Sequence, residues 1–434
     1  MRHFFIYSFI IVLLISCGKK VLSIPDTASP EERLKVEQAN ETYTSEAYVS
    51  LARYFKTAGN TPRALESYRL AHELDTANYT LRFEYGNFAY LNDYQNEGLK
   101  QFKHILNSSH SNTYFNRIMP YFITFDVKKL TNTTWNNAFP SFTNDGKSVV
   151  FQTDEHGNWD IKRVYLDSDS SEFLVRSPAN EEGPSFSPDL KKLVYTTDKF
   201  DTRIVDASQK WREIMMLDLN LNQIQRLTLN YCDDYYPRFS KENDQIIFVS
   251  ERADVRQIDY GQRHTNLYIM DSDGSFQVPL TKGDVYDQSG YVTEKLKTTI
   301  FSSKAPQSTF KLLEKTNSIK TVDTLLVYSG KNILSVDGTP DRTKVVFVSD
   351  KSGNNDLFMY NTISMQDEQL TFHPADDNKP SISPDGEKIV FHSNRDGFYN
   401  LYLIDLTKRS EEPTVENVLN KINQKLNSLT PTTP

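Results

Sequence analysis

The chain has 434 residues, which is long enough for more than one domain, and a formal net charge of −8. This mild acidity argues against a nucleic-acid-binding protein, because such a protein would carry a basic stripe. An aromatic content of 12% fits a protein with a large packed core.

The N-terminus has the pattern of a secretory signal. Arg2 and His3 precede an almost wholly apolar run, Phe4 to Ile15. That run is shorter than the roughly 20 residues of a spanning helix. Leu14-Ile15-Ser16-Cys17 resembles the bacterial lipobox, in which the cysteine is lipidated and becomes the new N-terminus. We expect a lipoprotein signal peptide over residues 1–16 and a linker over 17–29 after lipidated Cys17. The alternative is an ordinary signal peptide that ends on Cys by chance.

The lipobox resemblance implies a place in the bacterial cell envelope. Gly18 after the cysteine favours the outer membrane, with the protein facing the periplasm or the surface. Cys232 would be the only other cysteine of the mature chain, so no intramolecular disulfide could form. Stability must then come from packing.

Residues 30–118 show small and aromatic residues at positions that resemble tetratricopeptide repeats. The first copy contains Tyr48, Leu51, Ala52, Phe55, Gly59, Ala64, Tyr68 and Ala71. Gly86, Asp93, Gly98 and Phe102 follow 34 residues after their counterparts, with Asp93 replacing glycine and Arg82 replacing Tyr48. Two units are fewer than the three or so that a stable solenoid needs, so we expect support from other segments. The candidates are helices over 30–40 and 114–118, an amphipathic run over 415–426, and the domain that follows.

This helical domain has two possible roles. It either binds a peptide of a partner in its groove or only spaces the lipid from the rest of the chain. The sequence leaves both open.

A second repeat fills the rest of the chain. Six times a leucine is followed 21 places later by an aromatic residue, at Leu130/Phe151, Leu174/Tyr195, Leu227/Phe248, Leu280/Phe301, Leu326/Phe347 and Leu370/Phe391. A period of 44 to 53 residues with four short β-runs is typical of one propeller blade per repeat. The prediction is a mainly β protein, with a six-bladed β-propeller over residues 121–408 behind a short α-helical tetratricopeptide-like domain.

The last unit shows the pattern most fully. Pro380 opens an inner strand, Asp385-Gly386 makes the first hairpin turn, and Asp396-Gly397 makes the second. The sequence P-x-F-S-P-D-G-x-x-I-V-F, followed by S-x-R-x-G and an L-Y-x-x-D strand, resembles the propeller repeat of the TolB family of the Tol-Pal envelope system. In the fourth and fifth units Gly290 and Val336 replace the proline, so these units are identified from their leucine and aromatic positions alone.

The ring needs a closing strand. Leu130-Thr131 ends an outer strand that no earlier blade supplies, and the sixth blade lacks an outer strand of its own. We expect Tyr121–Val127 to pair with Leu401–Asp405, so that a strand within 121–129 closes the ring and removes a free sheet edge. Residues 409–434 would form a short helix and a polar tail.

An acidic channel mouth is the first candidate site. The residues three before the repeat proline position are Asn137, Glu181, Asp234, Asp287, Ile333 and Asp377. On one end of a propeller these would form a ring that attracts cations or a basic partner segment. The alternative is that each carboxylate only caps the turn into its own strand.

Two enlarged loops are the second candidate. Blades two and three each carry nine extra residues between the second and third strands, over 198–210 and 251–264. Enlarged neighbouring loops on a rigid scaffold suit recognition, although drift in tolerant surface loops explains them equally. The candidate partner-binding residues are Arg203, Asp206, Arg252, Arg256, Tyr260 and Arg263.

Catalytic motifs for serine hydrolases, zinc proteases and phosphate-binding loops are absent from the sequence. We therefore expect a non-catalytic envelope lipoprotein, without cofactor or metal, that binds an envelope protein or a wall-linked polymer and no nucleic acid. The resemblance implies a role like that of TolB in envelope integrity or transport complexes. The alternative is a propeller-type enzyme, a polysaccharide lyase or hydrolase, with a metal bound by His264, His373 and His392.

Overall fold

The computed structural model describes residues 44–429, except 169, 207–208, 243, 257, 259–261, 294–297 and 317–320, and also the short hairpin of β1 (Leu14–Ser16) and β2 (Lys19–Val21). Most of the expected signal peptide, Cys17 and the expected helix over 30–40 lie outside the described residues. The chain divides into two compact units, Met1–Phe122 with Pro413–Pro434, and Ile123–Glu412. None of the helices in the described residues is long and apolar enough to cross a bilayer.

The first unit is helical. Its elements are α2 (Ser45–Thr57), α3 (Thr61–Leu74), α4 (Tyr79–Leu91), α5 (Gln95–Leu106), α6 (Ser111–Ile118), the 3-10 turn η1 (Met119–Tyr121) and α7 (Val415–Leu429). Helices α4 and α5 approach closely because Gly86 and Gly98 have no side chain. A Cβ on Gly98 would lie 2.6 Å from Tyr90 Cβ and 2.7 Å from the carbonyl oxygen of Gly86.

The two departures in the helical repeat have local explanations. Asp93 adopts the left-handed backbone conformation at φ +68°, as Gly59 does at +71°, and Asp tolerates this region better than most residues. Arg82 is buried and donates to Gln101 Oε1 at 2.7 Å and to the carbonyl oxygen of Thr76 at 2.9 Å.

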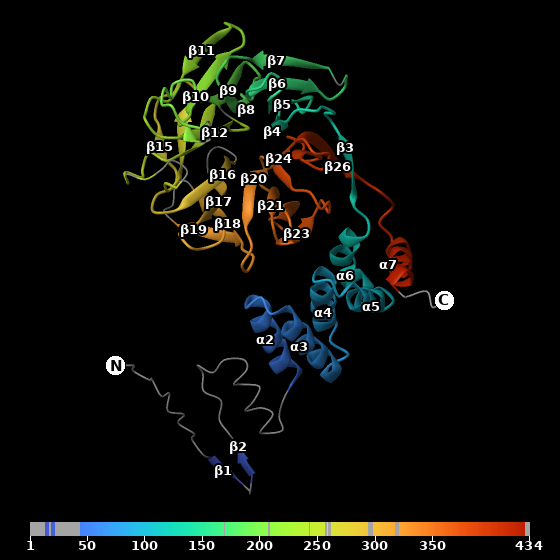
Figure 1. The fold of residues 1–434 in the computed structure, drawn as a ribbon. Helices are drawn as coiled ribbons and strands as arrows, with labels where there is room; N and C mark the ends of the chain where they lie inside the picture. Colours follow the sequence, from blue (N-terminus) through green and yellow to red (C-terminus); the bar gives the residue numbers. More distant parts are fainter. Residues whose placement is uncertain are drawn as a thin grey trace. The chain divides into compact units, whose positions relative to one another are not determined.

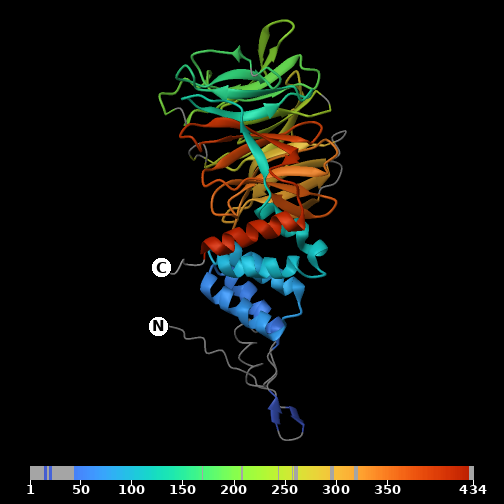
Figure 2. The ribbon, with the colours of Figure 1, turned by 90° about the vertical axis from the view of Figure 1, so that its right-hand side faces the viewer.

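The C-terminal helix α7 belongs to this helical unit. It buries Val418 and Ile422 and packs against α5, and Lys425 Nζ donates to Tyr90 Oη at 2.8 Å. Figure 2 shows α7, in red, alongside the cyan helices. The amphipathic run near the C-terminus therefore supplies support that two helical hairpins lack alone.

The second unit is a six-bladed β-propeller, as predicted, with six four-stranded sheets in its described residues (Figure 1). Blades one to three are β4 (Asn137–Phe142), β5 (Ser148–Thr153), β6 (Asp160–Tyr165), β7 (Ser171–Val175); β8 (Glu181–Phe186), β9 (Lys192–Thr197), β10 (Glu213–Asp218), β11 (Gln223–Arg226); and β12 (Asp234–Phe239), β13 (Gln245–Ser250), β14 (Asn266–Asp271), β15 (Val278–Pro279). Blades four to six are β16 (Tyr286–Val292), β17 (Thr298–Lys304), β18 (Lys311–Thr316), β19 (Val322–Leu326); β20 (Ile333–Gly338), β21 (Lys344–Ser349), β22 (Asp356–Asn361), β23 (Gln366–Gln369); and β24 (Asp377–Ile382), β25 (Lys388–Ser393), β26 (Asn400–Arg409), β3 (Phe125–Lys129).

The core lies between neighbouring blades. The six repeat aromatics sit on the second strands and are at most 3% exposed. Phe151 of blade one packs in one cluster with Val390 and Leu401 of blade six, which shows how the repeat spacing seals one blade against the next. In the fourth blade glycine replaces proline because the backbone is crowded. A Cβ on Gly290 would lie 2.9 Å from Phe301 Cβ.

The closing strand is β3. It pairs antiparallel with β26, with Val127 opposite Ile404 and Lys129 opposite Tyr402, and Figure 2 shows it as the teal strand beside the red ones. The strand starts at Phe125 and not at Tyr121, because Met119–Tyr121 forms the 3-10 turn. An upstream segment thus completes the last blade.

Candidate functional site

The expected acidic ring is not an exposed channel mouth. Asn137, Glu181, Asp234, Asp287 and Asp377 lie at the beginnings of the inner strands but are at most 2% exposed. Their partners are local. Asn137 donates to Thr133 Oγ1 at 2.6 Å, Glu181 accepts from Ser177 Oγ at 2.5 Å, and Asp287 accepts from Thr281 Oγ1. The prediction of an exposed partner-binding ring is therefore wrong, because carboxylates that are buried and hydrogen-bonded present no charge to a partner.

Two of these carboxylates form ion pairs that repeat between blades. Asp234 binds Arg252 Nη2 at 2.6 Å, and Asp377 binds Arg395 Nη2 at 2.7 Å, each across 18 residues of sequence. Both arginines belong to the S-x-R motif of the repeat. Arg252 therefore holds its own blade together, and its contact with a partner stays a prediction.

Three buried carboxyls of the propeller, two of them members of this ring, have raised pKa values. Burial, and to a smaller extent the charge of Asp160, raises the pKa of Glu181 to about 7. Burial and the charge of Asp377 raise the pKa of Asp356 to about 7, and burial raises that of Asp287 to about 6. Glu181 and Asp356 are therefore partly protonated near neutral pH.

The axis of the propeller is lined by a feature that sequence reasoning missed. Each inner strand has a bulge in its pairing with the second strand. The residue just before the repeat proline position has positive φ in five blades. These residues are Phe139 (52°), Gly183 (59°), Tyr236 (51°), Ser335 (50°) and Lys379 (49°). Residues other than glycine rarely adopt this conformation, so it costs Phe139, Tyr236, Ser335 and Lys379 about 1 kcal/mol each. The bulge holds them in it.

The residue after the repeat proline forms a second ring around the axis. Its members are Ser141, Ser185, Arg238, Tyr291, Asp337 and Ser381. The shorter members link neighbouring blades: Ser185 Oγ accepts from Phe239 N at 3.1 Å, and Ser381 Oγ accepts from Phe142 N at 3.2 Å. Asp337 Oδ2 does the same toward Ile382 N at 2.9 Å.

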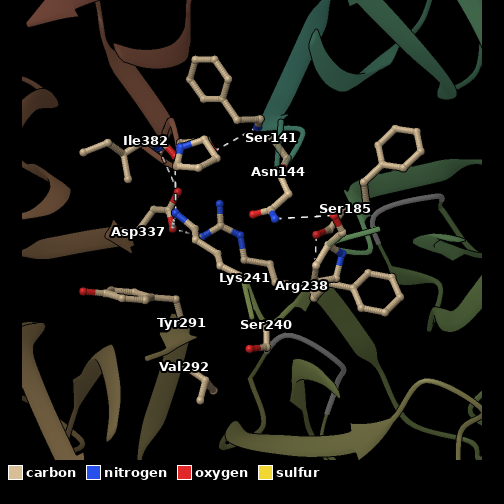
Figure 3. A pocket seen from close by; sticks show the side chains of 16 residues that line it. Ser141, Asn144, Ser185, Arg238, Ser240, Lys241, Tyr291, Val292, Asp337 and Ile382 are labelled. Atoms are coloured by element: carbon tan, nitrogen blue, oxygen red, sulfur yellow. Dashed lines mark hydrogen bonds and ion pairs between the residues drawn. The ribbon is translucent and has the colours of Figure 1, made fainter. Parts of the chain in front are cut away.

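Blades three and five carry opposite charges at this ring position. Arg238 Nη1 lies 3.2 Å from Asp337 Oδ1, and Lys241 Nζ lies 3.3 Å from the same oxygen. Figure 3 shows both cations beside Asp337 in the centre of the ring. Despite its burial, Arg238 and Lys241 lower the pKa of Asp337. The pair therefore bridges two blades that are not neighbours.

A cluster of aromatic and basic side chains lies two residues earlier in the repeat, around a cavity of about 60 Å³. The rings of Phe139 and Tyr236 stack with centroids 5.2 Å apart, and Lys379 Nζ lies 5.0 Å and 4.1 Å from those centroids. His392 accepts from Phe139 N at 3.1 Å through Nδ1, and Arg212 lies 4.6 Å from the ring of Tyr235. Residues from all six blades line this cavity.

The enlarged loops of blades two and three are ordered in the same way. Asp201 accepts from the backbone N of Arg203 at 3.0 Å and of Trp211 at 3.0 Å, and it also binds the Arg203 guanidinium. Asp254 repeats this with the backbone N of Arg256 at 3.1 Å and of His264 at 2.7 Å. In both loops the aspartate clamps residues two and ten positions later.

The clamps have an electrostatic signature. The Arg203 guanidinium lowers the pKa of Asp201 to about 2, and the Arg256 guanidinium lowers that of Asp254. Both carboxylates therefore stay charged at any physiological pH. The two enlarged loops thus share one clamp at the same offsets.

Large apolar side chains stand exposed on the same end of the propeller as these loops. Ile204 (105% exposed) and Val255 (90%) are in the loops, and Leu229 (80%) and Tyr231 (85%) are in the crossing between blades two and three. The Tyr231 ring lies edge-on to Trp211 at 6.0 Å. Of the other predicted loop residues, Asp206 is exposed, Arg263 is half-buried, and Tyr260 lies outside the described residues.

The three histidines of the enzymatic alternative are not brought together as a ligand set. His264 Nδ1 lies 3.3 Å from Asp284, His373 Nδ1 accepts from Ala375 N at 3.0 Å, and His392 lies at the axis. Within the described part of the chain, no three His, Cys, Asp or Glu side chains gather closely enough to hold a metal ion.

The axial residues had a signal in the sequence. The position after the repeat proline reads Ser in three blades but Arg238 and Asp337 in two others, and the position before it reads Phe139, Tyr236 and Lys379. An opposite pair of charges at one repeat position marks a contact across the ring. The bulge that turns the earlier position toward the axis has no such signal in one sequence.

No protein-family model matches the chain. An uncharacterised protein of Agrobacterium fabrum (strain C58) is 26% identical over 134 residues, which is 30% of this chain and 41% of that relative, so the chain spans less than half the length of the relative it matches.

Among solved structures, TolB from Acinetobacter baumannii is similar with a TM-score of 0.48 and 19% identity, covering 58% of each chain. An oligogalacturonate lyase from Vibrio parahaemolyticus has a TM-score of 0.45 and 15% identity, covering 65% of this chain and 93% of its own. The tricorn protease has a TM-score of 0.48 and 14% identity, covering 66% of this chain and 26% of its own. These TM-scores all lie below 0.5, and the six-bladed propeller is established by the strand order of the chain itself.

Proposed function

We propose that this chain is a lipid-anchored protein of the bacterial cell envelope whose propeller binds a partner protein and catalyses no reaction. The anchor is Cys17, and the location is the outer membrane, facing the periplasm or the surface. The signal pattern that ends in Leu-Ile-Ser-Cys supports this anchor and location. The helical unit spaces the propeller from the lipid or offers a second docking site.

The observation that carries the binding role is the pair of clamped loops in blades two and three. Exposed apolar groups on a rigid surface lose little conformational freedom when a partner covers them, and buried apolar and aromatic anchors supply most of the energy of an interface. Ile204, Tyr231 and Val255 are such anchors.

The charges around these anchors are balanced. Arg203 and Arg256 are paired with Asp201 and Asp254, and Lys199 and Asp206 are both exposed nearby. The apolar anchors, and not a net charge, therefore carry the proposed contact with a partner protein. A wall-linked polymer is the other partner class, and a role like that of TolB in envelope integrity or transport complexes is part of the same proposal.

Loop substitutions test the binding role. Replacing Ile204 and Val255 together with Ser removes two exposed apolar groups that make no core contact, so the melting temperature should stay the same. Loss of two central anchors should weaken capture of the partner in crosslinked intact cells by at least about tenfold. The matched control replaces Ile363 and Met365 with Ser. Each is 77% exposed, and both lie in the β22–β23 hairpin on the other end of the propeller.

An unchanged capture by the Ile204→Ser, Val255→Ser variant would refute the loop surface, as would an equal loss in the control. The anchor has its own test, because Cys17→Ser should move the protein from the membrane fraction to the soluble fraction of the envelope. A variant that stays in the membrane fraction would contradict lipidation at that residue.

A further inference from the structure

Lys379 is an unusual charge for the centre of a propeller. The bulge of β24 places it at the axis, and its ammonium lies over the stacked rings of Phe139 and Tyr236. In the part of the chain that the structure describes, no carboxylate lies within ion-pair distance of it. An ammonium that is partly removed from water and lacks a counter-charge is costly, unless an anion joins it.

The groups around Lys379 add to this positive potential. Arg212 is bound by Glu182 at 3.0 Å and Asp233 at 2.6 Å, and Arg238 shares Asp337 with Lys241. Four cations thus face three carboxylates. The other titratable groups near the ammonium are Tyr235, Tyr236 and His392, which are neutral at neutral pH because burial raises the pKa of the two phenols and lowers that of the imidazole.

Lys351 is a contrasting lysine in the same protein. Its ammonium also lies over two rings, 4.2 Å from Tyr328 and 4.5 Å from Phe358, but it is held by the carboxylate of Asp367 at 2.5 Å. Aromatic contact alone therefore does not account for a missing counter-charge. Among the described residues, no carboxylate lies beside Lys379 as Asp367 lies beside Lys351.

The cavity beside Lys379 limits what could fill that place. Its volume of about 60 Å³ has room for a few atoms or waters and not for a polymer. Gly183 and Ser335 leave space on one side, and Arg238 also lines the cavity and can bind a planar anion through its guanidinium. The excess of one positive charge matches a monoanion.

We propose that the axial cavity formed by Lys379, Arg238, Phe139 and Tyr236 is a binding site for a single carboxylate. The carboxylate belongs to a small free acid or to an acidic side chain that a partner inserts along the axis. This site is separate from the loop surface of blades two and three, so its failure would leave the proposed partner binding intact.

The site should depend on pH in a defined direction. Burial, together with the charges of Arg238 and Arg212, lowers the pKa of Lys379 to about 7. A carboxylate binds the charged ammonium, so affinity should be full below pH 7 and fall as pH rises through it. The protonated fraction falls about tenfold from pH 6 to pH 8, and the dissociation constant should rise by a similar factor.

The test is calorimetric titration of the purified full chain at pH 6 and pH 8, in buffers without carboxylate or phosphate. The probes are acetate, N-acetyl-glutamate amide and the neutral N-acetyl-glutamine amide. We expect saturable binding of the carboxylates, about tenfold weaker at pH 8, and none of the neutral amide. Acetate binding alone identifies a small free acid, and tighter binding of the glutamate derivative identifies a side chain.

Variants locate the site. Lys379→Met should abolish binding, Lys379→Arg should keep it and remove the pH dependence because arginine stays charged, and Lys351→Met should bind as the wild type does. Acetate should also protect Lys379, and not Lys351, from reductive methylation in the unmodified protein, which keeps the test valid if a variant fails to fold. Unchanged binding in Lys379→Met, no saturable binding at pH 6, or no protection of Lys379 would overturn the proposal.

Discussion

Replacement of Asp337 by Asn tests the charged ring at the propeller axis. The side chain keeps its size and can still accept from Ile382 N, but it loses the charge that holds Arg238 and Lys241. Removing one partner of a buried ion pair costs about 3–5 kcal/mol. The side chains of Arg238 and Lys241 are each about one-fifth exposed, so hydration offsets part of this cost. We therefore expect the free energy of unfolding to fall by about 3 kcal/mol.

Ser381→Ala is the matched control, because Ser381 holds the same repeat position and makes one neutral hydrogen bond to Phe142 N. Its loss should cost about 1 kcal/mol. Urea unfolding followed by tryptophan fluorescence measures both, since all three tryptophans, at 135, 159 and 211, lie in the propeller unit. If Asp337→Asn costs no more than Ser381→Ala, the ion pair across the axis does not stabilise the ring and our account of it fails.

Three further predictions concern the closing strand, the buried carboxyls and the loop clamps. Phe125→Ala should cost about 3 kcal/mol in the same urea assay, because Phe125 packs with Ile389 and Phe391 of blade six, whereas Phe276→Ala, at a 78% exposed position, should cost almost nothing. The Glu181→Gln variant should gain stability relative to the wild type, on the order of 1–2 kcal/mol, as the pH rises from 5 to 8. The raised pKa of Glu181 means that the folded wild type binds the proton more tightly than the unfolded chain does, so the wild type loses stability as the pH rises. A constant difference across this range would contradict the burial of a proton-binding carboxyl. Asp254→Asn should increase tryptic cleavage after Arg256, whose backbone N and guanidinium are bound by Asp254, and mass spectrometry reads the products. Asp206→Asn should leave the cleavage pattern unchanged, and equal cleavage of both variants would refute the clamp.

The repeat made most of the fold predictable. A leucine and an aromatic residue 21 places apart were enough to locate all six blades, even where Gly290 or Val336 had replaced the proline, because those two positions pack between blades and cannot change freely. Closure by an upstream strand followed from counting outer strands. These inferences depend on short-range periodicity, which one sequence contains.

The site was less predictable for a physical reason. Register gave the positions of Glu181, Asp234 and Asp377 but not their environment, and burial between blades turned an expected binding ring into internal ion pairs and turn contacts. The axial cluster was missed because a bulge rotates Lys379 and Tyr236 toward the axis, and strict strand alternation does not foresee that rotation.

The most direct test of the binding role is photo-crosslinking in intact cells from a single reactive residue in place of Tyr231, compared with one in place of Ile363. Tyr231 is exposed between the clamped loops, and Ile363 is similarly exposed on the opposite end of the propeller. We predict a defined protein product from position 231 that disappears in the Ile204→Ser, Val255→Ser background, and no such product from position 363. The same products from both positions, or a product from 231 that survives the loop substitutions, would contradict a binding surface on blades two and three.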